Sequence, residues 1–209
     1  MTHRTRHTQT TALLGSLSGS SLDRLHTLAD TLVDSLWGEV YAPQGPVPKD
    51  DLWRSCHDNI GNALKALNGV GPPAAVLLET ARATGMRRAR QHCPLGWVQR
   101  AWRIGGQVIW EDFACQAGVD DADELRRLVE SASRVWQVNE QFSAEMAAAY
   151  QSVEQEIAGD DQRADRVVAG REPTAAVDGG RRDPPSDGAG AAEDRAGVHR
   201  HAARCRNRA

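Results

Sequence analysis

The chain lacks the sequence features that mark several common classes of protein. Only two of its 25 basic residues are lysines, Lys49 and Lys65, and the net charge is -3 with a pI near 6.2. A nucleic-acid binder would be markedly basic over the whole chain, so the composition does not favour that class. No run approaches the roughly 18 apolar residues of a membrane-spanning helix, and the N-terminal segment has too short an apolar stretch for a secretory signal. We therefore expect a cytoplasmic protein with no membrane association.

Motifs typical of enzymes are also missing. The chain has no GxSxG, Walker, GxGxxG or HExxH sequence. Its four cysteines are far apart and form no CxxC pair, so their spacing indicates neither a zinc site nor a disulfide framework. We expect a protein that is not an enzyme, with no catalytic residues, cofactor or metal.

Large apolar residues disappear from the end of the chain. After Gly159 there is no Leu, Ile, Phe, Trp, Tyr or Met. Such a sequence cannot bury enough apolar surface to offset its conformational entropy, so residues 159–209 are predicted to form a disordered low-complexity tail. Three interpretations of this tail stay open: a charged interaction segment, solvated filler, and a translated frameshift of GC-rich DNA. Residues 1–19, rich in Thr, Ser and Arg, are predicted to be a disordered arm.

Residues 20–158 show the apolar spacing of three and four that is typical of helices. Asp50 or Asp51 is positioned to cap the second helix, and Pro72 and Pro73 suit the first turn of the third. The five predicted helices cover residues 20–41, 50–68, 72–91, 95–117 and 121–157. The last would be about 55 Å long at 1.5 Å per residue. The prediction is an all-α bundle of about five helices with a long final helix, and a helix of that length favours a homodimer.

Residues 85–113 combine three of the six tryptophans with five arginines. On predicted helices the two kinds of residue separate, because Trp102 joins the core face of helix 95–117 while the arginines mostly precede Pro94. A DNA-binding surface over Arg82–Arg90 is an alternative function. The helix-turn-helix pattern that would support it fails, since its core positions fall on polar residues. A solvated or ion-paired face is the simpler interpretation.

Two further groups are candidates for ligand binding. The carboxylates of residues 120–124 could hold a divalent cation, but acids at the start of a helix also stabilise its dipole, which we consider the better explanation. His57 and His92 are candidate haem or metal ligands. A surface histidine and a histidine at a helix end are the simpler interpretations of these two. A helical haem or metal-binding protein is thus a third, less favoured alternative.

Several short motifs resemble a known family. They are the Tyr41 and Pro43 turn, Asn59 with Ile60, Arg87-Arg88-Ala89 followed by Pro94-Leu95, Ala101-Trp102-Arg103, Trp110, Trp136 and Tyr150. They are similar to the N-terminal helical domain of actinobacterial PucR/CdaR-type transcriptional regulators, which is related to the N-terminal domain of RsbR/RsbRD stressosome proteins. The resemblance covers about residues 22–158. The candidate core and family residues are Trp53, Asn59, Arg87, Arg88, Ala89, Pro94, Leu95, Trp102, Arg103, Trp110, Trp136 and Tyr150.

The resemblance implies a regulatory or sensory input domain that self-associates and has no known catalytic residues. Such regulators continue into a leucine-rich middle domain and end in a DNA-binding helix-turn-helix. This chain departs from that pattern at about Asp160, so it lacks the DNA-binding end. The implied partners are a second copy and other regulatory proteins rather than DNA.

Overall fold

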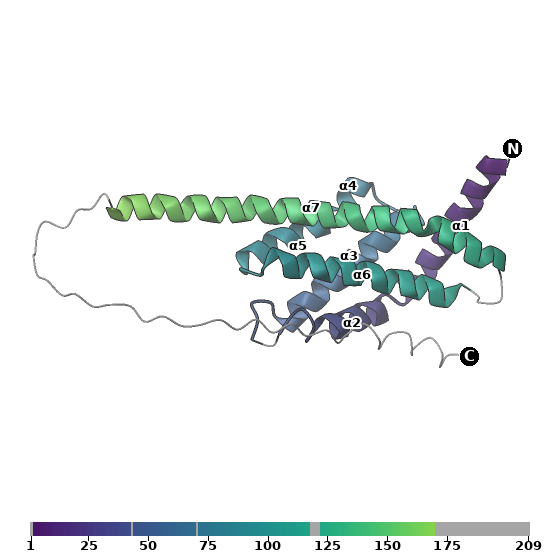
Figure 1. The fold of residues 1–209 in the computed structure, drawn as a ribbon, viewed down its shortest axis with the longest axis horizontal. Coiled ribbons are helices and arrows are strands. Elements are labelled where there is room, and N and C mark those ends of the chain that lie inside the picture. The colour runs from purple at the N-terminus through teal and green to yellow at the C-terminus, as the bar shows by residue number, and fades with distance from the viewer. Residues whose placement is uncertain (1, 43, 70, 118–121, 170–209) are drawn as a thin grey trace, which may run out of the picture. The chain divides into compact units, whose positions relative to one another are not determined.

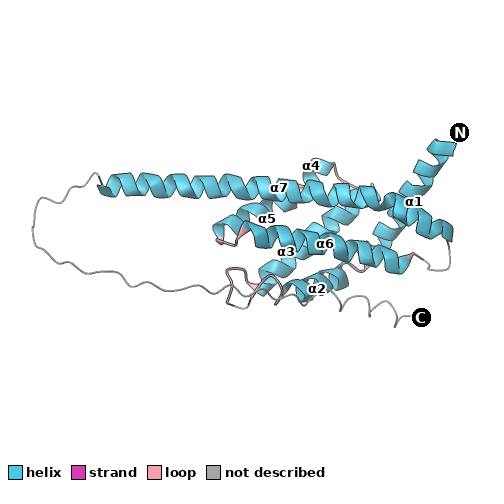
Figure 2. Ribbon diagram, viewed as in Figure 1, coloured by secondary structure: helices cyan, strands magenta, loops and turns pink. Residues whose placement is uncertain are grey.

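The computed structural model describes residues 2–42, 44–69, 71–117 and 122–169. Regular structure in these residues is helical and includes no β-strand, which confirms the predicted all-α class (Figures 1 and 2). The helices are α1 (Thr2–Asp23), α2 (Leu25–Leu36), α3 (Lys49–Asn68), α4 (Ala74–Leu77), α5 (Glu79–Arg90), α6 (Leu95–Gln116) and α7 (Ala122–Ala169). The chain divides into two compact units, residues 1–157 and 158–209, and the packing described below is that of the first. None of the described helices combines the length and apolar character needed to cross a bilayer.

Residues 2–23 form helix α1, which differs from the disordered arm expected over residues 1–19. α1 packs against α3, and its Leu14 and Leu17 are only 4% and 5% exposed. The side-chain amide of Asn68 on α3 donates to the Gly15 carbonyl at 3.1 Å. The large apolar residues of α1 are confined to its second half, so the apolar spacing along the segment was too brief to predict a helix. Tertiary packing against α3 supplies the stabilisation that local propensity lacks.

Two of the predicted helices are each divided by a turn. The first, expected over residues 20–41, is interrupted at Arg24, where φ of -113° and ψ of 19° separate α1 from α2. The third, expected over residues 72–91, is divided at Leu78 into the short α4 and α5. α3 keeps close to its predicted bounds and ends where Gly69 adopts φ of 73°, a left-handed conformation that favours glycine.

The final helix, α7, extends to Ala169 rather than to residue 157. The prediction of a disordered tail is therefore wrong for residues 159–169, and residues 170–209 lie outside the described part of the chain. Residues just after Gly159 are mostly Asp, Arg, Gln and Ala, and Arg163 pairs with Asp160 at 3.1 Å, three residues earlier. Such pairs support a helix without any apolar face.

The apolar residues of α7 lie on two faces rather than one. The buried face is made of Leu128, Ser131, Val135, Val138, Phe142, Met146, Tyr150 and Val153. Leu125, Val129 and Trp136 lie outside it and are 47%, 63% and 47% exposed. Trp136 was named among the candidate core and family residues, but it lies outside the buried face, because spacings of three and four fit both faces in this part of the helix.

Two glycines allow α7 to lie close to its neighbours (Figure 1). At Gly85 on α5, a Cβ atom would overlap the backbone carbonyl of Met146. At Gly106 on α6, a Cβ atom would lie 2.9 Å from Cγ of Asn139. At Gly85 the contact is with backbone, so glycine is required for the observed packing, whereas at Gly106 the contact is with the end of the Asn139 side chain, which would have to move.

Candidate functional site

A buried polar face of α3 meets a buried polar face of α5. On α3, Asp51, Ser55 and Asn59 follow one another at a spacing of four, which places them on one side of the helix. On α5, Thr84 and Arg88 have the same spacing. All five side chains are buried, and Arg88 is only 1% exposed. Buried polar groups are costly unless they are hydrogen-bonded, so their pairing determines what this site can do.

Arg88 is the largest fully buried side chain among the described residues, and almost all of its donors are used. Nη1 forms an ion pair with Oδ2 of Asp51 and donates to Oε1 of Gln91 at 2.7 Å. Nη2 donates to Oγ of Ser55 at 2.9 Å and to the Asp51 carbonyl at 3.4 Å. Gln91 Nε2 donates to the same carboxylate at 2.9 Å, and Nε of Arg87 lies 3.3 Å from its other oxygen. The buried charge is therefore fully compensated.

The surroundings of Asp51 lower the pKa of its carboxyl group. Burial by itself raises this pKa, but hydrogen bonds from Gln91 and Arg88, together with the charges of Arg88 and Arg87, outweigh it and bring the pKa below the ordinary 3.8. The carboxylate stays ionised and keeps Arg88 paired. Asp51 was predicted as a helix cap, but Pro48 occupies the N-cap position of α3 and Asp51 serves the ion pair.

Asn59 is hydrogen-bonded on one side only. Its Nδ2 donates to the Ser55 carbonyl at 2.8 Å and to Oγ1 of Thr84 at 2.9 Å. Its Oδ1 is buried and has no hydrogen-bond partner among the described residues. An unpaired buried acceptor costs about 1–3 kcal/mol. Asn59, named by the family resemblance, is thus the one residue of this polar face with an unmet hydrogen bond.

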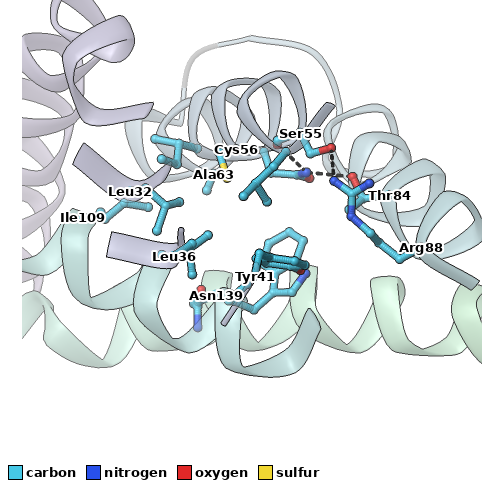
Figure 3. Close-up of a pocket in the computed structure, with 16 residues that line it drawn as sticks. Leu32, Leu36, Tyr41, Ser55, Cys56, Ala63, Thr84, Arg88, Ile109 and Asn139 are labelled. Carbon is cyan, nitrogen blue, oxygen red and sulfur yellow. Dashed lines mark hydrogen bonds between the residues drawn. The ribbon is translucent and has the colours of Figure 1, made fainter. Parts of the chain in front are cut away.

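A cavity adjoins this polar face and is lined by α2, α3, α5, α6 and α7. Ser55, Thr84 and Arg88 gather at one end, and Leu32 and Ile109 lie at the other (Figure 3). About 60 Å³ is open to the centre of a water-sized sphere. The remaining wall is mostly apolar and includes Leu36, Tyr41, Leu52, Cys56, Ile60, Ala63, Trp102 and Gly105. A mostly apolar cavity with a few polar groups at one end is the usual form of a small-molecule site.

The thiols near the cavity are poor nucleophiles. Cys56 lines the cavity, and burial raises the pKa of its thiol to about 12, although the charge of Arg88 acts in the opposite direction. Burial also raises the pKa of Cys93 and of Tyr41. A nucleophilic cysteine requires a lowered pKa, so the cavity favours binding over covalent chemistry.

Several of the predicted family residues hold the turn between α5 and α6 against α7. Ala89 and Tyr150 share a small apolar cluster, against which Leu95 packs. The Tyr150 hydroxyl donates to the Cys93 carbonyl at 2.9 Å, and Pro94 immediately precedes the first residue of α6. The role of these residues in the described structure is to fix the position of α7.

The remaining aromatic residues join α6 to α7. Trp102 lies 6.2 Å from Phe142 between ring centroids, and Trp110 lies 6.4 Å from Trp136. Trp102 also lines the cavity, whereas Arg103 is exposed. Trp102, which was predicted for the core, is half-buried and packs against the main apolar core.

The two candidate haem or metal histidines lie in unlike surroundings. His57 stacks on Trp53 with 5.0 Å between ring centroids and lies 3.2 Å from Asp58. Trp53 in turn donates its indole N–H to Asp30 at 2.7 Å. His92 is exposed in the turn after α5, with φ of 53°. No three potential ligands among His, Cys, Asp and Glu come together in the described residues.

The acidic cluster is described only in part. Asp120 and Asp121 lie outside the described residues, whereas Asp123 and Glu124 lie in the first turn of α7. Asp123 pairs with Arg126 at 2.9 Å within the same helix. The position of these acids at the helix start agrees with stabilisation of the helix dipole.

The arginines proposed as a DNA surface do not form one face. Arg88 is buried, and Arg87 pairs with Asp51. Arg82 pairs with Glu145 at 2.8 Å and with Glu79 at 3.0 Å. Protein carboxylates thus compete with phosphate for these cations, which reduces support for the DNA-binding alternative.

Sequence reasoning identified Asn59, Arg87 and Arg88 but did not connect them with Ser55 and Gln91. A signal was present, since polar residues recur every four positions at residues 51, 55 and 59 beside an apolar face. The spacing within one helix gives no distance between α3 and α5, so the hydrogen bonds between their polar residues could not be predicted.

Comparison with known protein families matches residues 26–165 to one described as the RsbT co-antagonist protein RsbRD N-terminal domain. The matched segment runs from α2 into α7 and includes both polar faces and the cavity. No curated protein matches the chain, and no solved structure does.

Proposed function

Because the chain belongs to the RsbT co-antagonist RsbRD N-terminal domain family, we propose that it is a sensory and regulatory domain that acts through association with another copy of itself. The observation that carries this proposal is the exposed apolar stripe of α7, which consists of Leu125, Val129, Ala132 and Trp136. Chemistry at the cavity is not needed for such a role. The domain transmits a signal through its interface rather than through catalysis.

The stripe has the spacing of a helix–helix interface. Its members follow at steps of four, three and four, the pattern of a and d positions in a coiled coil. Three of them are about half exposed or more. Trp110 on α6 lies against Trp136 and extends the apolar surface from α7 onto α6. A contiguous apolar surface of this kind on a water-soluble domain marks an interaction site.

Charge placement favours a second copy in antiparallel orientation. If the two-fold axis passes beside Ala132 and Ser133, these small residues lie at the crossing point and permit close approach. Arg126 then faces Glu140 of the other copy, and symmetry repeats this pair. Glu140 has no ion-pair partner among the described residues. Exposed ion pairs add little affinity, so the main effect of this pair would be to favour the antiparallel over the parallel arrangement of the two copies.

The wider context we propose is that of a cytoplasmic, PucR-type regulator of transcription whose DNA-reading part is not in this chain. Support comes from the resemblance carried by Asn59, Arg87, Arg88 and Trp102. The pairing of Arg82 and Arg87 with acidic side chains agrees with a regulatory domain that does not read DNA itself.

Light scattering at micromolar concentration tests the association. The expected mass is twice the 22.7 kDa of one chain. Val129→Glu should give a monomer, because it places a charge in the apolar stripe. Val76→Glu is the matched control, since Val76 is 57% exposed on α4 and lies outside the stripe. A monomeric wild-type protein would refute the proposal.

Charge reversal tests the orientation. Arg126→Glu and Glu140→Arg should each weaken the dimer by bringing like charges together, whereas the double variant should restore it. If the double variant is as weak as the two single changes combined, the antiparallel arrangement is wrong.

A further inference from the structure

Building on the sensory role proposed above, we infer that the cavity between α2, α3, α5, α6 and α7 binds a small neutral molecule that carries an N–H or O–H donor and an apolar body. The inference depends on the two asparagines at this cavity, Asn59 and Asn139, on its apolar wall and on its compensated charge. No part of the inference depends on the dimer interface.

Asn59 sets the requirement for a donor. Both hydrogens of its amide are directed to oxygen acceptors, one on Ser55 and one on Thr84. Oδ1 remains as a buried acceptor without a partner among the described residues. Water can satisfy this acceptor, so a bound molecule that displaces water here is favoured when it presents an N–H or an O–H group of its own.

Asn139 offers a second polar contact on α7. Its amide lies against Gly106 of α6, where a Cβ atom would be 2.9 Å from Nδ2. It makes no hydrogen bond to any residue in the described part of the chain. Asn139 lies on the side of the cavity away from Ser55 and Arg88 (Figure 3). Its amide can both donate and accept, so a molecule with a donor and an acceptor fits better than one with a donor alone.

The charge balance favours a neutral molecule. Among the described residues of the cavity wall, Arg88 alone is charged, and its guanidinium already pairs with Asp51. An anion would have to compete with that carboxylate, and a cation would find no free carboxylate in the wall. Either ion would lose its hydration without a partner, which is unfavourable.

The size of the cavity limits the molecule to a few atoms. At roughly 10–15 Å³ for each water-sized site, the space of about 60 Å³ holds about four to six non-hydrogen atoms. Leu32, Leu36, Ile60, Ile109 and Trp102 surround that space with apolar groups. A short branched amide or alcohol meets the limits of size, charge and hydrogen bonding together.

Isobutyramide and isobutyrate form a suitable pair of probes, because they have nearly the same shape and differ in charge and in the amide donor. Binding to the full chain can be followed by NMR through the indole N–H signal of Trp102. We expect saturable binding of isobutyramide at millimolar concentration, and at least tenfold weaker binding of isobutyrate. Equal binding of the two, or no saturable shift with isobutyramide, would overturn the inference.

Two glycines on α6 provide a matched pair of variants. A Cβ atom at Gly105 would lie 3.5 Å from Leu32, an ordinary contact, so Gly105→Ala fits and takes up cavity space. Gly96 has open space around it, so Gly96→Ala leaves the cavity unchanged. Isobutyramide binding should weaken at least threefold in Gly105→Ala and stay the same in Gly96→Ala. Equal affinity in the two variants would place the probe elsewhere.

Asn59→Leu tests the acceptor itself, since leucine has a similar size and no hydrogen-bonding group. Isobutyramide binding should fall at least tenfold in this variant, and circular dichroism verifies that it folds. Unchanged binding would remove Asn59 from the site. Light scattering on the same samples separates the two proposals: a dimer without probe binding contradicts only the cavity, and a monomer that binds the probe contradicts only the association.

Discussion

The guanidinium group of Arg88 is enclosed between α3 and α5 and paired with the carboxylate of Asp51, 37 residues earlier in the chain. The pair joins two helices that are separated in sequence, and it forms the polar end of the cavity. The structural cost of removing it can therefore be measured separately from any binding.

Replacing Arg88 with leucine should lower the free energy of unfolding by about 3–5 kcal/mol, because it leaves the buried Asp51 carboxylate with fewer partners. Urea unfolding at pH 7 measures the loss. Arg90→Leu is the control on the same helix, since Arg90 is exposed, and it should change stability by less than about 0.5 kcal/mol. Similar losses of unfolding free energy in the two variants would show that the buried Arg88–Asp51 pair stabilises the fold no more than an exposed arginine does.

The pH dependence of stability should identify Asp51. Its pKa is lowered in the folded state, so its ionised form stabilises the fold above the unfolded-state pKa, and this contribution disappears as the pH falls through the folded-state value. The difference in unfolding free energy between wild type and Asp51→Asn should be constant above about pH 5 and shrink below about pH 4. Exposed Asp50 provides the control: Asp50→Asn should show little change. A difference that grows toward low pH would contradict this assignment.

Gly85→Ala should destabilise the fold by about 1–3 kcal/mol or more, because its methyl group would collide with the Met146 carbonyl and push α7 away from α5. Gly96→Ala lies in open space and should be neutral or stabilising by up to about 1 kcal/mol through helix propensity. Thermal unfolding of both variants tests the close approach. Equal behaviour would mean that α5 and α7 are further apart than described.

Leu17→Ala should cost about 2–5 kcal/mol, since Leu17 on α1 is 5% exposed and packed in the main core. Leu125→Ala, at a residue that is 47% exposed, should cost less than about 1 kcal/mol in a monomer. The comparison should be made at a protein concentration where the chain is monomeric. If Leu17→Ala leaves stability unchanged, residues 1–19 would instead form the disordered arm predicted from the sequence.

Parts of the fold follow directly from the sequence. The apolar spacing predicted a helix over residues 50–68, and the structure has α3 there with Cys56, Ile60, Leu64 and Leu67 on its buried face. The candidate site was predicted only in part, because the sequence identified Asn59 and Arg88 as separate residues and did not place them in one site. The neighbouring sequence does not indicate that Oδ1 of Asn59 would lack a hydrogen-bond donor. It also does not indicate that Asp51 would form an ion pair with Arg88.

Local spacing and composition determined the helical class, most helix positions and the lack of familiar catalytic motifs, because these depend on short-range preferences and on the 3.6-residue period. Tertiary structure decided the rest. Packing against α3 made α1 a helix, and contact with α5 and α6 selected which of two apolar faces of α7 is buried. The cavity exists only where five helices meet, since its polar end, its apolar wall and its unpaired Asn59 oxygen come from segments that no local pattern can bring together.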